Sequence, residues 1–501
     1  MRFTGKLGFI VWFALLALGK VFAADQRPNI VLMVADDHGR EAYGAYGNHA
    51  IKTPHLDQLA REGTLFNHAY ATTASCSASR SVLLSGLHNH ANGQYGHAHA
   101  FHHFHTFPTV KSLPAYLHEA GYRTARVGKF HLAPASSYDF EFDLKEQRPK
   151  NATTVGSRKP MGVKLLPQVV DAKTGERNTV GMALAAKAII ESDDPRPFFL
   201  YLATNDPHRS GGVNALGDNI FGNAADLDGK GTDRLDYRPE NVIVPHYLPD
   251  LPETRRELAE YYQSIGRVDD TAGVLIQQLK AAGKYDNTLF IYLSDNGTAM
   301  PGAKTTLYDP GVRLPLVVRA PKQKRRGISV EVMVSWVDIT PTILDFAGVE
   351  FAENPFHGRS FRKVINGKAD SEWNEVYASH TFHEVTMYYP MRMVRTRDYK
   401  LIWNIAHGLR YPFASDLQKS STWQAATNPI LEKFGTRAMQ DYLYRPKFEL
   451  YDMSDKQLEP VEEVNLADDP KYAKIKASLI AKLKAFQQRT NDPWKYKWDY
   501  E

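Results

Sequence analysis

The only cysteine of the chain lies in a segment that suits the binding of an anion. Cys76 follows the small and hydroxyl residues of 71–75, and a helical pattern begins directly after it. Backbone N–H groups at the start of a helix favour anions and thiolates. Arg80 lies about one helical turn further on and can face the same pocket. The spacing predicts a reactive cysteine, although a free cysteine packed among small residues explains it equally well.

Polar side chains follow several apolar runs that read as buried strands. Three such runs end in groups that can bind a metal or move a proton: 29–35 before Asp36 and Asp37, 197–204 before His208, and 288–294 before Asp295 and Asn296. Open α/β sheets carry their sites outside the carboxyl ends of the strands. Asp and Asn also simply end strands, but three such ends in one chain favour a shared site.

Helical patterns between these runs predict the architecture that must position the groups. Apolar residues recur at three- and four-residue steps in 54–63, 113–120 and 253–283, and a fourth strand-like run covers 314–320. Strands that alternate with helices predict an α/β fold with a doubly wound, largely parallel sheet.

The pattern changes after about residue 370. Short alternating runs begin at 375, 391, 400 and 447, and they predict antiparallel strands. A lysine-rich amphipathic helix is expected over 472–489. We therefore expect a catalytic domain over 24–370 and a smaller α+β subdomain over 371–501.

Composition excludes several classes of protein. The chain has 501 residues, of which 43% are hydrophobic and 23% are charged, so it is neither disordered, collagen-like nor a coiled coil. The net charge of +5 is too small to indicate a nucleic-acid partner. With a single cysteine, no disulfide can form within the chain.

The first 23 residues have the features of a signal peptide. Arg2 and Lys6 precede an apolar run over 7–18, and small residues allow cleavage after Ala23 or Ala24. The run is shorter than the roughly 20 residues of a membrane-spanning helix. We expect a periplasmic or secreted bacterial protein with no membrane contact beyond export; the sequence leaves its oligomeric state open.

The segment Cys76-Ser-Ala-Ser-Arg80 resembles the C-x-P/A-x-R signature of formylglycine-dependent sulfatases. Further stretches are similar to other elements of that family: 27–39 with its acidic pair, 121–131 with Gly-Lys-x-His, 293–297, 304–318 and 449–467. The resemblance covers residues 27–498. It implies an alkaline-phosphatase-like, doubly wound mixed sheet and a smaller C-terminal subdomain.

Within the family, the chain most resembles the N-sulfoglucosamine sulfohydrolases, or sulfamidases. The stretches that carry this likeness begin at Asn92, His102, Asp206, Phe382 and Asn491. This closer resemblance implies exolytic removal of the N-sulfate from glucosamine in heparan-type glycans.

The family resemblance also implies a cofactor set and roles for individual residues. One calcium ion would be held by Asp36, Asp37, Asp295, Asn296 and the formylglycine (3-oxoalanine) made from Cys76. A formylglycine-generating enzyme or an anaerobic maturase would carry out that conversion. The catalytic residues implied are Cys76, Arg80, Lys129, His131, His208 and Lys304. His208 is expected to be the general acid, with His131 assisting the aldehyde hydrate.

Four residues outside these motifs are expected to contact the sugar: His102, His103, Glu384 and Arg392. Ordinary surface pairing explains Glu384 and Arg392 equally well. Seven of the 19 histidines fall between His88 and His105. Because this stretch has no cysteine partner and no repeated ligand spacing, we favour a loop that lines the substrate pocket over a transition-metal site.

Other functions remain to be weighed. The main alternative is an O-sulfatase acting on an algal polysaccharide such as ulvan. A phosphatase or phosphodiesterase of the same superfamily is more remote, because those enzymes carry serine or threonine as nucleophile and more metal ligands. A binding protein or inactive relative is disfavoured, because every expected pocket residue is present.

Overall fold

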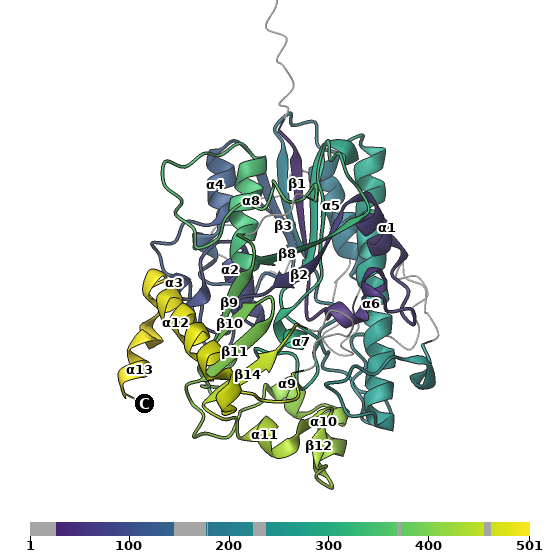
Figure 1. Ribbon diagram of the computed structural model, residues 1–501. Coiled ribbons are helices and arrows are strands. Elements are labelled where there is room, and N and C mark those ends of the chain that lie inside the picture. Colours follow the sequence, from purple (N-terminus) through teal and green to yellow (C-terminus); the bar gives the residue numbers. More distant parts are fainter. Residues whose placement is uncertain are drawn as a thin grey trace, which may run out of the picture.

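The computed structural model describes residues 27–144, 177, 179–223, 237–367, 372–454 and 462–500. The predicted signal segment, 1–23, lies outside these ranges. The centre is an eight-stranded mixed sheet with the order β4-β3-β5-β1-β6-β7-β2-β8 (Figure 1). Its strands are β1 (Asn29–Ala35), β2 (Thr64–Tyr70), β3 (Arg123–Gly128), β4 (Phe142–Asp143), β5 (Phe198–Ala203), β6 (Thr288–Ser294), β7 (Leu316–Arg319) and β8 (Ile328–Ser335).

Four neighbouring strands in the middle of this sheet run parallel. β3 pairs with β5, β5 with β1, and β1 with β6. Ala35 lies opposite Ser294, and Ala203 is in register with both Val34 and Gly128. The carboxyl ends of the four strands therefore meet at one edge. β7 runs antiparallel to both neighbours, which makes the sheet mixed.

Helices cover both faces of the sheet, because successive side chains of the buried strands point to opposite faces. Ile30, Leu32 and Val34 pack in one core cluster and Val31, Met33 and Ala35 in another, all without exposed surface. The first face is covered by α2 (Cys76–Leu83), α4 (Leu113–Glu119) and α8 (Ile339–Phe346). The second is covered by α1 (Pro54–Glu62), α5 (Val180–Ile190) and α6 (Pro252–Ala281). The predicted doubly wound architecture is thus confirmed.

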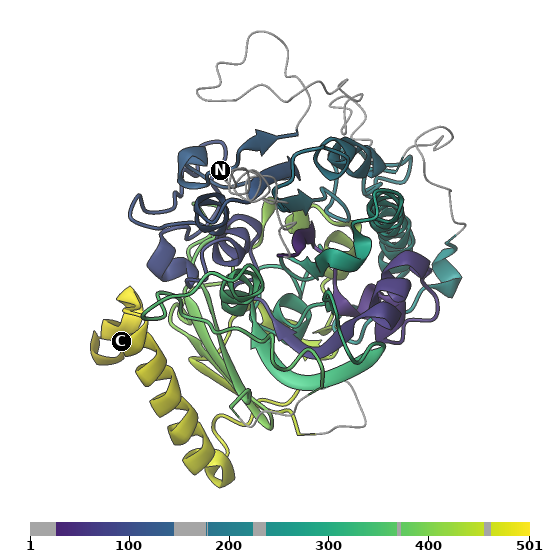
Figure 2. The same cartoon turned by 90° about the horizontal axis from the view of Figure 1, so that it is seen from above.

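A four-stranded antiparallel sheet follows in the C-terminal part, with the order β14-β11-β10-β9. Its strands are β9 (Glu375–His380), β10 (Met391–Thr396), β11 (Tyr399–Asn404) and β14 (Phe448–Asp452). Met391 and Met393 face the main domain, whereas Val394 and Leu401 pack against α12 (Ala473–Arg489). Figure 2 shows the small sheet between the main domain and this yellow helix.

Short elements complete the described structure, and the expected strands and helices agree with it to within a few residues. They are α3 (Asn89–Asn92), α7 (Asp309–Val312), α9 (Ser415–Gln418), α10 (Ser421–Thr427), α11 (Met439–Leu443), α13 (Lys497–Tyr500), β12 (Lys433–Phe434) and β13 (Arg437–Ala438). Among the described residues, none of the helices combines the length and the apolar character that a membrane crossing requires.

Candidate active site

The central parallel strands bring the predicted site residues to one edge of the sheet. Asp36 and Asp37 follow β1, and Asp295 and Asn296 follow β6; His208 comes after β5, and Lys129 and His131 come after β3. The first four, which we call the oxygen cluster, have at most 1% of their surface exposed. Residues that are far apart in the sequence thus meet because their strands are neighbours.

Hydrogen bonds tie the oxygen cluster together. The Asp37 backbone N–H donates to Oδ1 of Asp295 at 3.1 Å. The Asn296 amide nitrogen donates to Oδ1 of Asp37 at 2.5 Å. Oδ1 of Asn296 is buried and has no hydrogen-bond partner among the described residues. The cluster therefore presents carboxylate and amide oxygens that its own N–H groups only partly satisfy.

Three cations surround these carboxylates: Arg80 and Lys304 are buried, and Lys129 is partly buried. Arg80 Nε donates to Asp295 Oδ2 at 2.8 Å, and Arg80 Nη2 also lies 3.4 Å from Asp36 Oδ1. Lys129 Nζ donates to Asp36 Oδ2 at 2.6 Å, and Lys304 Nζ donates to Asp37 Oδ2 at 3.0 Å. Each cation thus has a carboxylate partner, which a charge at this depth requires.

The pKa values of the carboxyls show how tightly their charges interact. Burial raises the pKa of Asp36, but Lys129 and other cations outweigh it, so the pKa falls well below its ordinary value. Burial and the charges of Asp36 and Asp37 raise the pKa of Asp295, although Arg80 opposes the rise. One carboxyl of the cluster is therefore difficult to ionise unless more positive charge is present.

Cys76 is the first residue of α2 and lies against the oxygen cluster. Its Sγ is 3.8 Å from Oδ1 of Asp37, and the side chain has no exposed surface. Burial raises the pKa of the thiol well above its ordinary value, even though Lys129 and Lys304 lower it. Desolvation thus opposes ionisation of this thiol more strongly than the nearby positive charge favours it.

His208 joins the cluster through Lys304. Its Nδ1 donates to the Arg209 carbonyl at 2.7 Å, which leaves Nε2 to accept from Lys304 Nζ at 2.9 Å. Asp416, on α9, accepts from the same ammonium group at 2.9 Å and lies 3.6 Å from His208 Nε2. Burial and Lys304 lower the pKa of His208. Sequence reasoning missed Asp416, because no motif marks this short helix of the C-terminal part.

His131 lies in a group of neighbouring histidines. Its Nε2 contacts Nδ1 of His99, and its ring stacks on His97 with centroids 4.7 Å apart. His97 Nε2 lies 2.9 Å from Nε2 of His383, whose Nδ1 hydrogen-bonds with Ser75. The crowding of histidines in the sequence indicated that this loop lines the pocket. It did not predict which imidazole rings contact one another.

The residues expected to contact the sugar fall in different places. His102 Nδ1 accepts from the Val385 N–H at 3.1 Å, and Glu384 Oε1 accepts from the Ser415 N–H at 2.9 Å. Both thus lie near the segment that carries Asp416. His103 is exposed, and its ring neighbour in the structure is His105 at 6.5 Å.

Arg392 takes a different position from the one expected. It has no exposed surface, and its Nε and Nη2 donate to the two carboxylate oxygens of Asp492 at 2.5 and 2.8 Å. Its guanidinium also lies 4.8 Å from the centre of the Trp494 ring. The expected sugar contact is corrected to an internal ion pair, because the side chain has no exposed surface and Asp492 accepts from one edge of its guanidinium.

Comparison with known proteins supports the family resemblance. Residues 28–349 match the sulfatase family, and residues 303–420 match the family described as N-sulphoglucosamine sulphohydrolase, C-terminal. The chain is 38% identical to the human N-sulphoglucosamine sulphohydrolase over 483 residues, covering 93% of this chain and 91% of the relative. It is 28% identical to an ulvan-active sulfatase of Formosa agariphila, covering 95% and 83% of the two chains.

A solved structure described as a complex with its substrate D-glucosamine-2-N,6-O-disulfate shares the fold. Its TM-score is 0.63 at 22% identity, and the match covers 93% of this chain and 98% of the other. The alkaline-phosphatase-like sulfatase fold is therefore confirmed, with its mixed sheet and smaller antiparallel sheet. The chain hydrolyses sulfate from sulfated glycans, and it belongs to the sulfatase family.

Proposed function

We propose that this chain is an exported, sulfamidase-like sulfatase that removes the N-sulfate from a terminal glucosamine of heparan-type glycans. The observation that carries the proposal is the set of three cations held beside residue 76, of which Arg80 and Lys304 are buried and Lys129 is partly buried. A transferring sulfate group needs fixed positive charge where its oxygens gain charge. The likeness to the human N-sulphoglucosamine sulphohydrolase supports the choice of an N-sulfate.

The oxygen cluster fits a calcium ion. Its donors are carboxylate and amide oxygens, which calcium prefers. A bound cation would give the unpartnered Oδ1 of Asn296 a partner, and it would stabilise the ionised form of Asp295, whose pKa is raised. Sulfatases generally use a divalent cation and formylglycine; we assign calcium to Asp36, Asp37, Asp295, Asn296 and residue 76.

When present, the calcium ion supplies positive charge to the sulfate oxygens, and the formylglycine made from Cys76 supplies a nucleophilic hydroxyl. Lys129 and Lys304 bind sulfate oxygens, because their ammonium groups are fixed by Asp36 and Asp37. Arg80 holds Asp295 in place through its Nε. These side chains are already oriented, so little reorganisation is needed during the reaction.

Two histidines move the protons. With Nδ1 of His208 bound to the Arg209 carbonyl, an additional proton is placed on Nε2, close to Lys304 and Asp416. We assign His208 as the general acid for the leaving amine. We assign His131 to accept the proton of the residue-76 hydroxyl, because its Nδ1 is buried and unpartnered among the described residues.

Loops around the sulfate-binding groups contact the sugar and determine which sugar is bound. Glu384 fixes the start of α9 through Ser415, and His102 fixes Val385. We infer that these loops hold a terminal sugar, which makes the reaction exolytic. Glu384→Gln should then reduce turnover of the glycan more than turnover of an aryl sulfate, which uses only the sulfate-binding groups.

Export and maturation complete the proposal. Residues 1–23 direct the chain to the periplasm or the medium, and a formylglycine-generating enzyme or an anaerobic maturase converts Cys76. Both steps are testable by N-terminal sequencing of the mature protein and by the mass of the peptide that contains residue 76.

Defined sulfated oligosaccharides of three or more residues test the substrate. We expect release of sulfate and of a free amine from N-sulfoglucosamine at the non-reducing end, with little release from the internal position. Protein with Cys76→Ala serves as the control and should be inactive. Release from O-sulfated sugars but never from N-sulfoglucosamine would reject the sulfamidase proposal while leaving the sulfatase family assignment intact.

The second candidate function is an O-sulfatase acting at the end of an algal oligosaccharide such as one from ulvan. The likeness to an ulvan-active sulfatase over most of both chains favours it. The same assay with ulvan oligosaccharides distinguishes the two candidates, because an O-sulfate releases an alcohol and no amine.

A further inference from the structure

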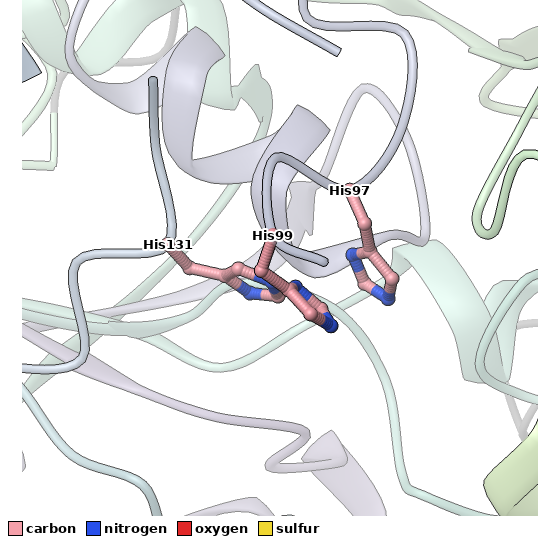
Figure 3. A group of neighbouring side chains, drawn as sticks. All are labelled: His97, His99 and His131. Carbon is pink, nitrogen blue, oxygen red and sulfur yellow. The ribbon is translucent and has the colours of Figure 1, made fainter. Parts of the chain in front are cut away.

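Three histidines beside the proposed catalytic groups converge from two separate stretches of chain. His97 and His99 belong to the loop after α3, and His131 follows β3 (Figure 3). Each ring offers a nitrogen, and these nitrogens all lie within 4.8 Å of one another. We call His97, His99 and His131 the histidine cluster. Such a group of nitrogens could hold one metal ion.

In the histidine cluster, ring nitrogens of neighbouring histidines face one another. His99 Nδ1 meets His131 Nε2, and His97 Nε2 meets His383 Nε2 at 2.9 Å. A neutral imidazole carries one N–H, so each such pair shares one proton between two lone pairs. Ser75 holds Nδ1 of His383 at 2.9 Å and thereby steadies the far side of the group. The lone pairs are thus positioned before any ligand arrives.

The electrostatic surroundings keep these rings uncharged. Burial lowers the pKa of His97 and His131 well below the ordinary value and also lowers that of His99. The positive charge of Lys129 repels a metal ion in the histidine cluster. Its ammonium group is paired with Asp36 at 2.6 Å, which reduces this repulsion. The negative charge of Glu384 raises the pKa of His99 and so opposes the effect of burial. His99 is exposed, so the cluster can be reached from solvent.

We propose that His97, His99 and His131 bind one transition-metal ion of the zinc type, and that this ion inhibits the enzyme. Imidazole nitrogens suit zinc, nickel and copper, whereas calcium requires oxygen ligands. Three protein ligands leave a coordination position open to water. The inhibitory part rests on the proposed function, because a metal on His131 prevents that ring from accepting a proton.

Zinc binding to the mature, calcium-loaded protein tests the site directly. We expect calorimetry near neutral pH to show one zinc ion that is lost or weakened by roughly tenfold or more in His99→Asn and in His97→Asn. His105→Asn is the matched control, because His105 lies exposed on the same loop and outside the cluster. Cobalt(II) provides a second readout, since its visible absorption reports nitrogen ligation in wild type and its loss in the variants.

The variants are needed because other groups could also hold zinc, namely Asp37 with His208 and Asp416, and His55 with Asp269 and Asp270. Equal zinc binding in wild type and both cluster variants would overturn the proposal, as would the absence of any zinc binding to wild type. Calorimetry does not depend on turnover, so failure of the proposed function leaves this test intact. Stoichiometric zinc without loss of turnover would overturn the inhibitory part.

Discussion

The oxygen cluster and the histidine cluster both contact the first residues of α2. Cys76 Sγ contacts Asp37 of the oxygen cluster at 3.8 Å. The neighbouring Ser77 hydroxyl lies 3.5 Å from Nδ1 of His97. The start of α2 therefore contacts both a site made of carboxylate and amide oxygens and a site made of imidazole nitrogens.

The two clusters differ in how the fold builds them. The oxygen cluster follows the ends of β1 and β6. These two strands are paired in register up to Ala35 and Ser294, so the pairing fixes the positions of the residues that follow. The histidine cluster joins two residues of the loop after α3 to His131, which follows β3, and one of its rings, His99, is exposed. The oxygen cluster is therefore buried, and its carboxylates are paired with cations. The histidine cluster can be reached from solvent, and its imidazole nitrogens face one another.

The largest expected effect comes from the oxygen cluster. Asp37→Asn removes the carboxylate that accepts from Lys304 and Asn296. We expect turnover to fall by about a thousandfold, because the positive charges that bind sulfate lose their fixed partner. Sulfate release measures the effect. The control is Asp286→Asn, whose side chain is 94% exposed; near-normal turnover in Asp37→Asn would remove this cluster from the mechanism.

Metal removal should distinguish the two clusters next. Exhaustive chelation is expected to lower Tm, because the charges of Asp36, Asp37 and Asp295 are then compensated only by Arg80, Lys129 and Lys304. A ligand at a hundred times its Kd stabilises the folded state by about 2.7 kcal/mol. Calcium should restore Tm and zinc should not. Equal restoration by both ions would show that the oxygen cluster does not select by ligand chemistry.

A smaller effect is expected from the histidine cluster without added metal. His99→Asn removes the ring that contacts Nε2 of His131. We expect kcat to fall by roughly tenfold and KM to change little, since His99 acts only through a proton-transfer residue. A loss as large as that of Asp37→Asn would mean that both clusters are equally essential.

The smallest effect concerns buried histidines outside both clusters. His88 and His90 stack with centroids 5.5 Å apart, and burial lowers the pKa of His90 from 6.5 to about 3. Its folded pKa is depressed, so the unfolded chain binds a proton first and stability falls as pH drops below 6.5. Between pH 6.5 and about 5, the contribution is about 2 kcal/mol.

His90→Gln should therefore flatten the decline in unfolding free energy on acidification, as followed by denaturant titration at several pH values. The exposed His105→Asn should leave the slope unchanged. An identical slope in His90→Gln and wild type would show that burial of this imidazole does not contribute to acid sensitivity. Neither variant of this pair should change zinc binding.

The contrast between the clusters also explains what the sequence could predict. Asp36, Asp37, Asp295 and Asn296 each follow an apolar run, so strand periodicity alone indicated that they share an edge. His97 and His99 were noticed only as members of a crowded loop, because which rings meet depends on His131 and His383 from other elements. The pattern around Arg392 gave no sign of Asp492, since an ion pair one hundred positions apart leaves no local signal.

The central claim is that residue 76, beside the oxygen cluster, provides the nucleophile after conversion to formylglycine. The direct measurement is the mass of the peptide containing residue 76, taken together with turnover, for protein made with different amounts of maturase. Conversion replaces one sulfur and two hydrogens by one oxygen. We predict that turnover rises in proportion to the converted fraction and is absent in Cys76→Ala. Full turnover in protein that retains the unmodified thiol would contradict the account.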